Sequence, residues 1–317
     1  MFSDLKAVDV YAAAHRLRGV TTRTPLTRSP GLTEIAGGPV YLKLENEQVT
    51  GSFKVRGAFN AIALLPDAVR ARGVVTSSAG NHGLGVAYAA QRFGIPATIF
   101  IPADAPAVKR DGIAALGATV DSESEDYDAA MRKARALAVR EGLTYIHPCL
   151  GEPLLAGQGT VALEIIEELP DVATVVVPVG GAGLLGGMGS LLRRVAPAVR
   201  IVGAQSVNTA AMARSLAADA VIPIPSLATL ADGLAGLIDD YALDIGRHTL
   251  DAMITLEESE ISRAIAWLHR EDAIYAEGSG AVGVAALLER RVNDLQSPVA
   301  IVITGANIDA ARHALCR

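Results

Sequence analysis

The sequence predicts an α/β fold in which short apolar strands alternate with helices. Apolar runs that are rich in Val and Ile recur along the chain, and such runs are typical of parallel strands covered on both faces. Stretches rich in Ala and Leu lie between them and predict helices. The βα units form two groups, one near residues 47–148 and one from about residue 150 onward. Alternation of this kind implies right-handed crossovers.

The expected elements follow from this alternation. The expected strands are Val40–Leu44, Gly73–Ser77, Ala97–Ile101, Thr174–Val179, Arg200–Gln205 and Val299–Thr304. The expected helices are Asn81–Phe93, Tyr127–Glu141, Gln158–Leu169, Ser259–Arg270 and Gly280–Arg291, and residues 1–17 form an amphipathic pattern that predicts one more. The turn-rich stretch HPCLGEP at 147–153 is a candidate domain boundary.

The composition argues against several classes of protein. The 317 residues suffice for one large domain or two ordinary ones, and half are hydrophobic. A net charge of -6 argues against a nucleic-acid or membrane-surface partner. The sequence lacks an apolar run long enough to span a membrane and an N-terminal signal peptide. The two cysteines, Cys149 and Cys316, form no CxxC pair, so a reducing cytoplasm is expected and a disulfide framework or zinc site is not.

A turn at Thr50-Gly51-Ser52 precedes Lys54, which falls in the first turn of an expected helix. A lysine in a chain is ordinarily a surface residue, but this chain has five lysines and Lys54 is the one beside a glycine turn. Lys54 is therefore a candidate for covalent chemistry with an aldehyde.

Two glycine-containing loops follow expected strands, which is where ligands bind in open α/β sheets. The first is TSSAGNHGLG at 76–85. It suits a carboxylate or phosphate, although a plain strand-to-helix turn with Asn81 as helix cap and a packing His82 accounts for it as well.

The second loop, VPVGGAGLLGGMGS at 177–190, is the strongest anion cradle in the chain. Gly181, Gly183 and Gly186 also satisfy GxGxxG, but the next expected strand ends at Gln205. A dinucleotide site needs an acid there, so a phosphate monoester fits the loop better.

Two shorter segments complete the set. Thr304 ends the last expected strand in VAIVITGANID, and Glu277 stands before an expected helix in AEGSGAV. Each alone is explained by a strand-end turn or a helix-start acid. Motifs of metalloproteases, P-loop proteins and α/β-hydrolases are missing, and no metal site is expected.

Taken together, the segments resemble the serine/threonine dehydratase family of fold-type-II pyridoxal-phosphate enzymes. The matching stretches, in the family's order, are RTPL (23–26), SFKVRGA (52–58), SAGNH (78–82), GGAGL (180–184), ADGLAG (231–236), EGSGA (277–281) and TGAN (304–307). The resemblance implies two open twisted sheets flanked by helices, as in enzymes like tryptophan synthase β. It implies a large cofactor-binding domain from residues 1–46 plus 149–317 and a small domain from residues 47–148. It also suggests the short catabolic form, since the chain ends soon after TGANID.

The resemblance also implies roles for individual residues. Lys54 forms a Schiff base with pyridoxal phosphate, Phe53 and Asn81 flank the ring, Asn81 bonds its 3-hydroxyl and Thr304 partners its nitrogen. The backbone N–H groups of Gly180, Gly181, Ala182, Gly183 and Leu184 hold the phosphate, Glu277 belongs to the cofactor site, and Ser78, Ala79, Gly80, Asn81 and His82 hold the substrate carboxylate. The family's loop usually reads four glycines in a row, and Ala182 stands at the third place, where a Cβ is tolerable if φ is negative.

The implied activity is the dehydration and deamination of a small β-hydroxy amino acid, such as L-threonine or L-serine, to a 2-oxo acid and ammonia. Alternatives are a serine racemase, a 3-hydroxyaspartate dehydratase, a dehydratase for another β-substituted amino acid, or a binding protein without activity. Segments near Cys149–Pro153 and Ala231–Tyr241 are expected to line the side-chain pocket. A cytoplasmic homodimer with an amino-acid substrate is the family expectation.

Overall fold

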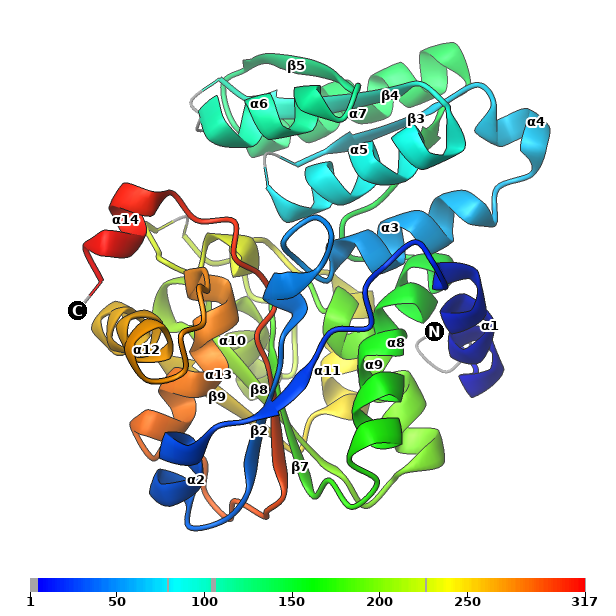
Figure 1. Cartoon of the computed structure of the whole chain (residues 1–317). Coiled ribbons are helices and arrows are strands. Elements are labelled where there is room, and N and C mark those ends of the chain that lie inside the picture. The colour runs from blue at the N-terminus through cyan, green and yellow to red at the C-terminus, as the bar shows by residue number, and fades with distance from the viewer. Residues whose placement is uncertain (1–4, 79, 104–106, 226, 317) are drawn as a thin grey trace.

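The computed structural model describes residues 5–78, 80–103, 107–225 and 227–316, and it contains two β-sheets flanked by helices (Figure 1). The larger sheet has the strand order β1 (Leu26–Arg28), β2 (Val40–Lys43), β10 (Val299–Val302), β7 (Thr174–Pro178), β8 (Arg200–Ser206) and β9 (Ala252–Leu256). The smaller sheet has the order β5 (Thr119–Ser124), β4 (Ala97–Pro102), β3 (Val74–Ser77) and β6 (Thr144–Tyr145). All neighbouring strands are parallel except β1 and β2.

The chain builds the smaller sheet between two visits to the larger one. It leaves the larger sheet after β2 and returns to it at β7. The last strand, β10, lies between β2 and β7, so that Val299 pairs with both Val40 and Thr174. The larger sheet therefore brings together segments that are distant in sequence.

The principal helices have these bounds: α1 (Ala7–Leu17), α2 (Pro30–Ala36), α3 (Lys54–Ala63), α4 (Asp67–Arg70), α5 (Asn81–Phe93), α6 (Ala107–Ala115), α7 (Tyr127–Glu141), α8 (Glu152–Glu168), α9 (Gly183–Val195), α10 (Ala211–Ala218), α11 (Asp240–Thr249), α12 (Glu258–Glu271), α13 (Gly278–Leu288) and α14 (Ala310–Ala314). Helix α8 packs against both α9 and α3. Since α3 belongs to the segment that leads into the smaller sheet, α8 joins that segment to the larger sheet (Figure 1).

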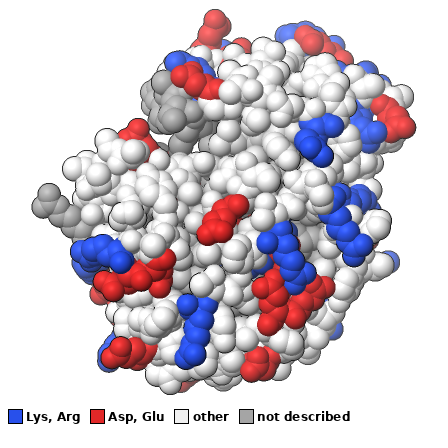
Figure 2. Space-filling view, viewed as in Figure 1, with Lys and Arg blue, Asp and Glu red and all other residues white. Residues whose placement is uncertain are grey.

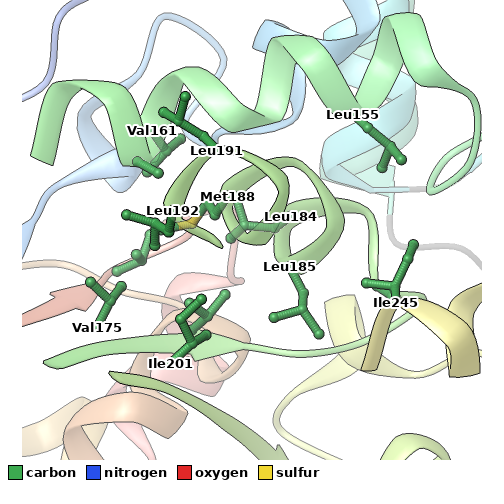
Figure 3. Packing of buried hydrophobic residues seen from close by; sticks show 14 of the residues in the cluster. Leu155, Val161, Val175, Leu184, Leu185, Met188, Leu191, Leu192, Ile201 and Ile245 are labelled. Carbon is green, nitrogen blue, oxygen red and sulfur yellow. The ribbon is translucent and has the colours of Figure 1, made fainter. Parts of the chain in front are cut away.

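Buried side chains cover both faces of the larger sheet. Val175 and Val177 of β7 pack into a cluster with α8 and α9, whereas Val176 packs into a second cluster with α12 and α13. This alternation follows from the two-residue period of a strand. Figure 3 shows the first cluster, in which Leu155 of α8 and Leu191 of α9 lie above Val175 and Ile201. Full burial on both faces explains why these strands are apolar throughout.

The six expected strands are all present, with ends shifted by one or two residues. The strands that the sequence did not predict are β1, β5, β6 and β9, and they are the four edges of the two sheets. Edge strands are partly exposed, as the mixed burial of β5 (TVDSES) illustrates, so they lack the continuous apolar run that reveals a central strand. Helix α8 begins at Glu152, six residues before the expected start at Gln158. Pro153 does not prevent this earlier start, because it occupies the first turn, where proline is tolerated.

A buried network of charges ties the start of α3 to the larger sheet and to α8. Arg56 donates from Nε to Glu45 at 2.8 Å and from Nη1 to Glu164 at 2.6 Å. Lys43 Nζ lies 2.7 Å from the same Glu164 and is fully buried. Burial by itself would raise the pKa of Glu45, but the charge and hydrogen bonds of Arg56, with help from Thr24, hold that pKa below its ordinary value. The two cations and two carboxylates balance, which is what a buried ionic cluster requires.

The surface shown in Figure 2 carries basic and acidic side chains interspersed, without a large field of one sign. The described part of the chain has no helix that is both long and apolar enough to cross a membrane.

Candidate active site

The turn before Lys54 is held against the segment that follows β10. Ser52 forms an antiparallel bridge with Gly305, and Phe53 N donates to the Thr304 carbonyl at 3.2 Å. Gly51 has a φ of 69°, and a Cβ there would lie 2.7 Å from Asn307 Oδ1. Glycine is therefore required for both the backbone conformation and the space. This pairing fixes where α3 begins and brings Thr304 next to the lysine's loop.

Lys54 is the first residue of α3, and its side chain is partly exposed. Its Nζ donates to the Pro148 carbonyl at 3.0 Å and lies 4.0 Å from Cys149 Sγ. The same amine lies 5.3 Å from the centre of the buried Phe53 ring. The amine is thus held at the segment that the sequence marked as a boundary and a pocket lining.

The glycine loop between β7 and α9 lies against that same segment. A Cβ on Gly181 would lie 2.7 Å from Cys149 Sγ, and one on Gly183 would lie 3.0 Å from Cys149 Cα. On its other side, a Cβ on Gly180 would lie 3.0 Å from Leu234 Cα. Larger residues would fill this space, so the glycines keep the loop's backbone close to its neighbours.

Helix α9 begins in this loop, and its cap residue, Ala182, has no polar side chain that could cap it. The N–H groups of a helix's first turn have no partner inside the helix, and they attract anions. The loop GGAGL therefore fits a phosphate group, with Leu184 in the first turn of α9.

Ala182 corrects one expectation, because its φ is +63° rather than negative. An alanine in this left-handed conformation costs about 1–2 kcal/mol relative to the right-handed one. Ala182 is buried and is the cap residue of α9, so packing around it holds the backbone in the conformation that a glycine would adopt more easily.

The loop between β3 and α5 forms a second uncapped helix start. Its cap residue is Gly80 rather than Asn81, and glycine has no side chain that could cap the helix. Ser78 Oγ accepts a hydrogen bond from Gly80 N at 3.2 Å, and a Cβ on Gly83 would lie 2.3 Å from the Ser78 carbonyl. Ala79 lies outside the described residues.

His82 in this loop is buried and neutral. Burial lowers its pKa to about 3, with a further contribution from the charge of Lys54. Its Nε2 lies 3.1 Å from the Ile146 carbonyl, so this nitrogen carries the proton and donates. The ring thus packs the loop against the residues before Pro148, and it is not placed to act as a base.

Asn81, Glu277 and Asn307 form a hydrogen-bonded row beside this loop. Asn81 Nδ2 donates to Glu277 Oε1 at 2.6 Å, and Asn307 Nδ2 donates to Asn81 Oδ1 at 2.5 Å. Glu277 is buried and occupies the N-cap position of α13, where its side chain makes no capping hydrogen bond, while Asn307 follows β10. The Glu277 carboxylate therefore also binds the Asn81 amide, besides standing at the start of a helix. The role of Asn307 was not predicted, although TGAN was among the motifs recognised.

Thr304 is buried but lies two residues beyond the end of β10 at Val302, not at the end of the strand. A Cβ on Gly280 would lie 3.2 Å from Thr304 N. The start of α13 thus packs tightly against the Thr304 segment.

The described residues include no cluster of three or more His, Cys, Asp or Glu side chains suited to a metal ion. Gln205, at the end of β8, donates to the Thr209 carbonyl at 3.1 Å and accepts from Ala213 N at 3.1 Å. Its amide closes the turn into α10.

The site thus unites a lysine amine, an uncapped helix start suited to phosphate, and an amide–carboxylate pair at the strand ends of the two sheets. These are the features of an enzyme that binds a phosphorylated aldehyde cofactor. The chain belongs to the family of pyridoxal-phosphate-dependent enzymes, whose family model matches residues 17–305. Pyridoxal phosphate is accordingly its cofactor, and the uncapped glycine loop and the nearby Lys54 amine fit that group.

Particular relatives narrow the class. The chain is 44% identical over 302 residues to an L-threonine ammonia-lyase of Thermotoga maritima, covering 95% of this chain and 75% of the relative. It is 37% identical to a catabolic L-threonine dehydratase of Staphylococcus aureus, with 96% and 89% covered. Among solved structures, it is similar to maize serine racemase, with a TM-score of 0.93, 32% identity and 97% and 95% covered. It is also similar to threonine deaminase isoform 2 of Solanum lycopersicum, with a TM-score of 0.90, 32% identity and 96% and 85% covered.

Proposed function

We propose that this chain is a pyridoxal-phosphate-dependent ammonia-lyase that converts L-threonine or L-serine to a 2-oxo acid and ammonia, with Lys54 as its cofactor-binding lysine. The observation that carries the proposal is that Cys149 lies beside both the Lys54 amine and the glycine loop, while the neighbouring Pro148 carbonyl accepts a hydrogen bond from that amine. This arrangement gives one cofactor an attachment point and a phosphate site at the same time. The named threonine ammonia-lyase relatives support the reaction.

The proposed cofactor contacts come from both sheets. Backbone N–H groups of residues 180–184 would hold the phosphate, as their position at the start of α9 supports. Phe53 and Asn81 would flank the ring, Asn81 would donate to the ring's 3-hydroxyl oxygen, and Thr304 would meet its nitrogen. Glu277 would support Asn81 through the hydrogen bond between them.

We further propose that the loop from Ser78 to His82, Ala79 included, holds the substrate carboxylate. The uncapped start of α5 offers backbone N–H groups there. The buried ring of His82 would contribute by shaping the loop rather than by touching the substrate. Backbone donors of this kind suit a carboxylate, because a helix start favours negative charge.

The chemistry divides between the cofactor and the chain. When bound, pyridoxal phosphate supplies an electron sink that stabilises negative charge at the substrate's Cα. The Lys54 amine, once released, would remove the Cα proton. Thr304 offers a hydroxyl rather than a carboxylate and so would not hold a proton on the ring nitrogen. The cofactor would then be a weaker electron sink. A weaker electron sink suffices when a hydroxyl departs from Cβ.

Serine racemisation is the second candidate, and the likeness to maize serine racemase favours considering it. It would need an acid or base on the side opposite Lys54. The residue before Gly80-Asn81 is Ala79, which can neither give nor take a proton, so elimination is the better-supported reaction.

Borohydride reduction of the cofactor-loaded enzyme, followed by peptide mapping, tests the assignment of Lys54. The pyridoxyl group should appear on Lys54, and Lys54→Ala should abolish turnover, whereas Lys133→Ala on the exposed face of α7 should not. Labelling of another lysine would refute the assignment. A panel of L-amino acids assayed for 2-oxo acid release identifies the substrate, and release from neither threonine nor serine would overturn the proposed reaction.

We also propose that residues 1–46 plus 149–317 form the large domain and residues 47–148 the small one, since the smaller sheet is built entirely from residues 74–145. A homodimer in the cytoplasm remains the family expectation, and light scattering on the eluted protein tests the assembly.

A further inference from the structure

We propose that Asn307 is a positioning residue, which fixes the orientation of the Asn81 amide so that an N–H faces the cofactor's ring oxygen. This inference rests on the proposed function, in which Asn81 contacts that oxygen. Asn307 would act through Asn81 and would itself touch neither cofactor nor substrate.

The orientation of the Asn307 amide is determined by its neighbours. Its Nδ2 lies 2.9 Å from the Thr50 carbonyl and 2.5 Å from Asn81 Oδ1. A carbonyl can only accept, so the Asn307 atom that faces Thr50 must be the nitrogen. An amide nitrogen has two hydrogens, and these two contacts use both of them.

The orientation of the Asn81 amide follows from this. Because Asn307 presents a donor, the Asn81 atom in contact with it must be the oxygen. The Asn81 nitrogen then lies 2.6 Å from Glu277 Oε1 and gives that carboxylate one hydrogen. Glu277 is the one acceptor recorded for this nitrogen within the described residues, so its second hydrogen is left for a ligand. A flipped Asn81 would set donor against donor at Asn307 and acceptor against acceptor at Glu277.

Asn307 is also restrained from swinging away. A Cβ on Gly51 would lie 2.7 Å from Asn307 Oδ1 and 3.2 Å from its Cγ, so the side chain packs directly on the glycine turn. Ala306 N donates to the Gly51 carbonyl at 2.9 Å, which joins the two backbones. The turn that precedes Lys54 thereby also fixes the position of the Asn307 side chain. Because Asn307 bonds to Asn81, the positions of Lys54 and Asn81 are linked through this turn.

This arrangement has a spectroscopic consequence. A hydrogen bond from an amide N–H to an ionised ring oxygen favours the ionised form. Asn307 would therefore influence the absorbance of the bound cofactor and the pH at which that absorbance changes. A residue that served only the fold would not move that pH.

Asn307→Asp tests the proposal, because it keeps the shape of the side chain and replaces the donor with an acceptor. Oxygen would then face Thr50 O and Asn81 Oδ1, so Asn81 should flip or withdraw. We expect cofactor binding to weaken by roughly 10-fold or more, in line with the loss of a partly buried hydrogen bond. We also expect the pH midpoint of the visible band to shift. Asn293→Asp, a matched change at an exposed position, should alter neither.

Asn307→Ala removes both donors without adding an acceptor. It should change the pH midpoint of the visible band and the cofactor affinity in the same direction as Asn307→Asp, but by a smaller amount. If Asn307→Asp does not fold, as judged by circular dichroism of the apoprotein, Asn307→Ala decides the question. If a folded variant binds the cofactor as tightly as the wild type and shows the same pH midpoint of the visible band, the inference is overturned. The proposed function would remain intact. A wild-type protein without a visible band on adding pyridoxal phosphate would instead overturn the proposed function.

Discussion

Arg56→Met removes the cation at the centre of the buried charge network behind Lys54. Arg56 and Glu45 are 1% and 0% exposed, so water cannot replace the lost partner. Glu45 would keep the Thr24 hydroxyl but lose both bonds from Arg56. Removing one partner of a buried ion pair typically costs about 3–5 kcal/mol, because the other charge stays buried without compensation. We expect a loss of that size in the free energy of unfolding at neutral pH.

The loss should depend on pH in a defined direction. In the wild type, the pKa of Glu45 is lowered from its ordinary value, so its contribution to stability is present above the unfolded-state pKa and disappears as pH falls through the folded-state value. In the variant, burial acts without Arg56 to oppose it and raises the pKa of Glu45. Folding then binds a proton, and the variant gains stability as pH falls. The difference in the free energy of unfolding between the wild type and Arg56→Met should therefore narrow from neutral pH toward about pH 4.

Urea unfolding of the apoproteins, followed by far-UV circular dichroism across this pH range, measures the difference. Arg140→Met is the matched control, because the Arg140–Glu141 pair is exposed and such pairs contribute about 0–1 kcal/mol. Adding Glu45→Gln to Arg56→Met should recover part of the loss, since it removes the stranded charge. A loss below about 1 kcal/mol, or one that stays constant with pH, would refute the argument that burial dominates this network.

Three further outcomes are expected. Mg²⁺ should give little activation and chelator little inhibition in a 2-oxo acid assay, because the described residues bring no three His, Cys, Asp or Glu side chains together as a metal site; several-fold stimulation would contradict this. L-Serine should yield pyruvate far faster than D-serine, and Ala79→Ser should raise the proportion of D-serine, measured by chiral chromatography; equal rates in the wild type would disprove the assignment. Ala182→Gly should raise the apoprotein's free energy of unfolding by roughly 0.5–1 kcal/mol, because glycine adopts a positive φ without strain but loses more entropy on folding. A destabilised Ala182→Gly protein would show that packing of the Ala182 methyl outweighs the backbone strain.

The sequence predicted the parts of the fold and site that depend on local patterns. Helices α5 and α7 begin and end where their patterns do, and the central strands are revealed by burial on both faces. The glycine turn before Lys54 and the glycine loop at residues 180–184 could be recognised because backbone conformation limits the residues allowed there.

Contacts between distant segments could not be predicted in this way. Nothing near Asn307 in the sequence indicates that it meets Asn81, and nothing near Cys149 places it between Lys54 and Gly181. The φ of Ala182 was misjudged for a similar reason, because packing around it, rather than its own preference, sets the backbone. The ion pair between Lys43 and Glu164 could not be predicted either, since the two residues lie far apart in the sequence, on β2 and α8.

The position of β10 also affects the order in which the protein can assemble during synthesis. Residues 74–145 contain every strand of the smaller sheet, so that sheet can pair before the ribosome has made the rest of the chain. The larger sheet must wait, because β2 and β7 are joined only through β10 at residues 299–302. Such long-range pairing is slow and leaves strand edges unpaired until it is complete. The edges of β2 and β7 that pair with β10 therefore stay open in the nascent chain until residues 299–302 have been made, and this is the stage at which a chaperone would matter most.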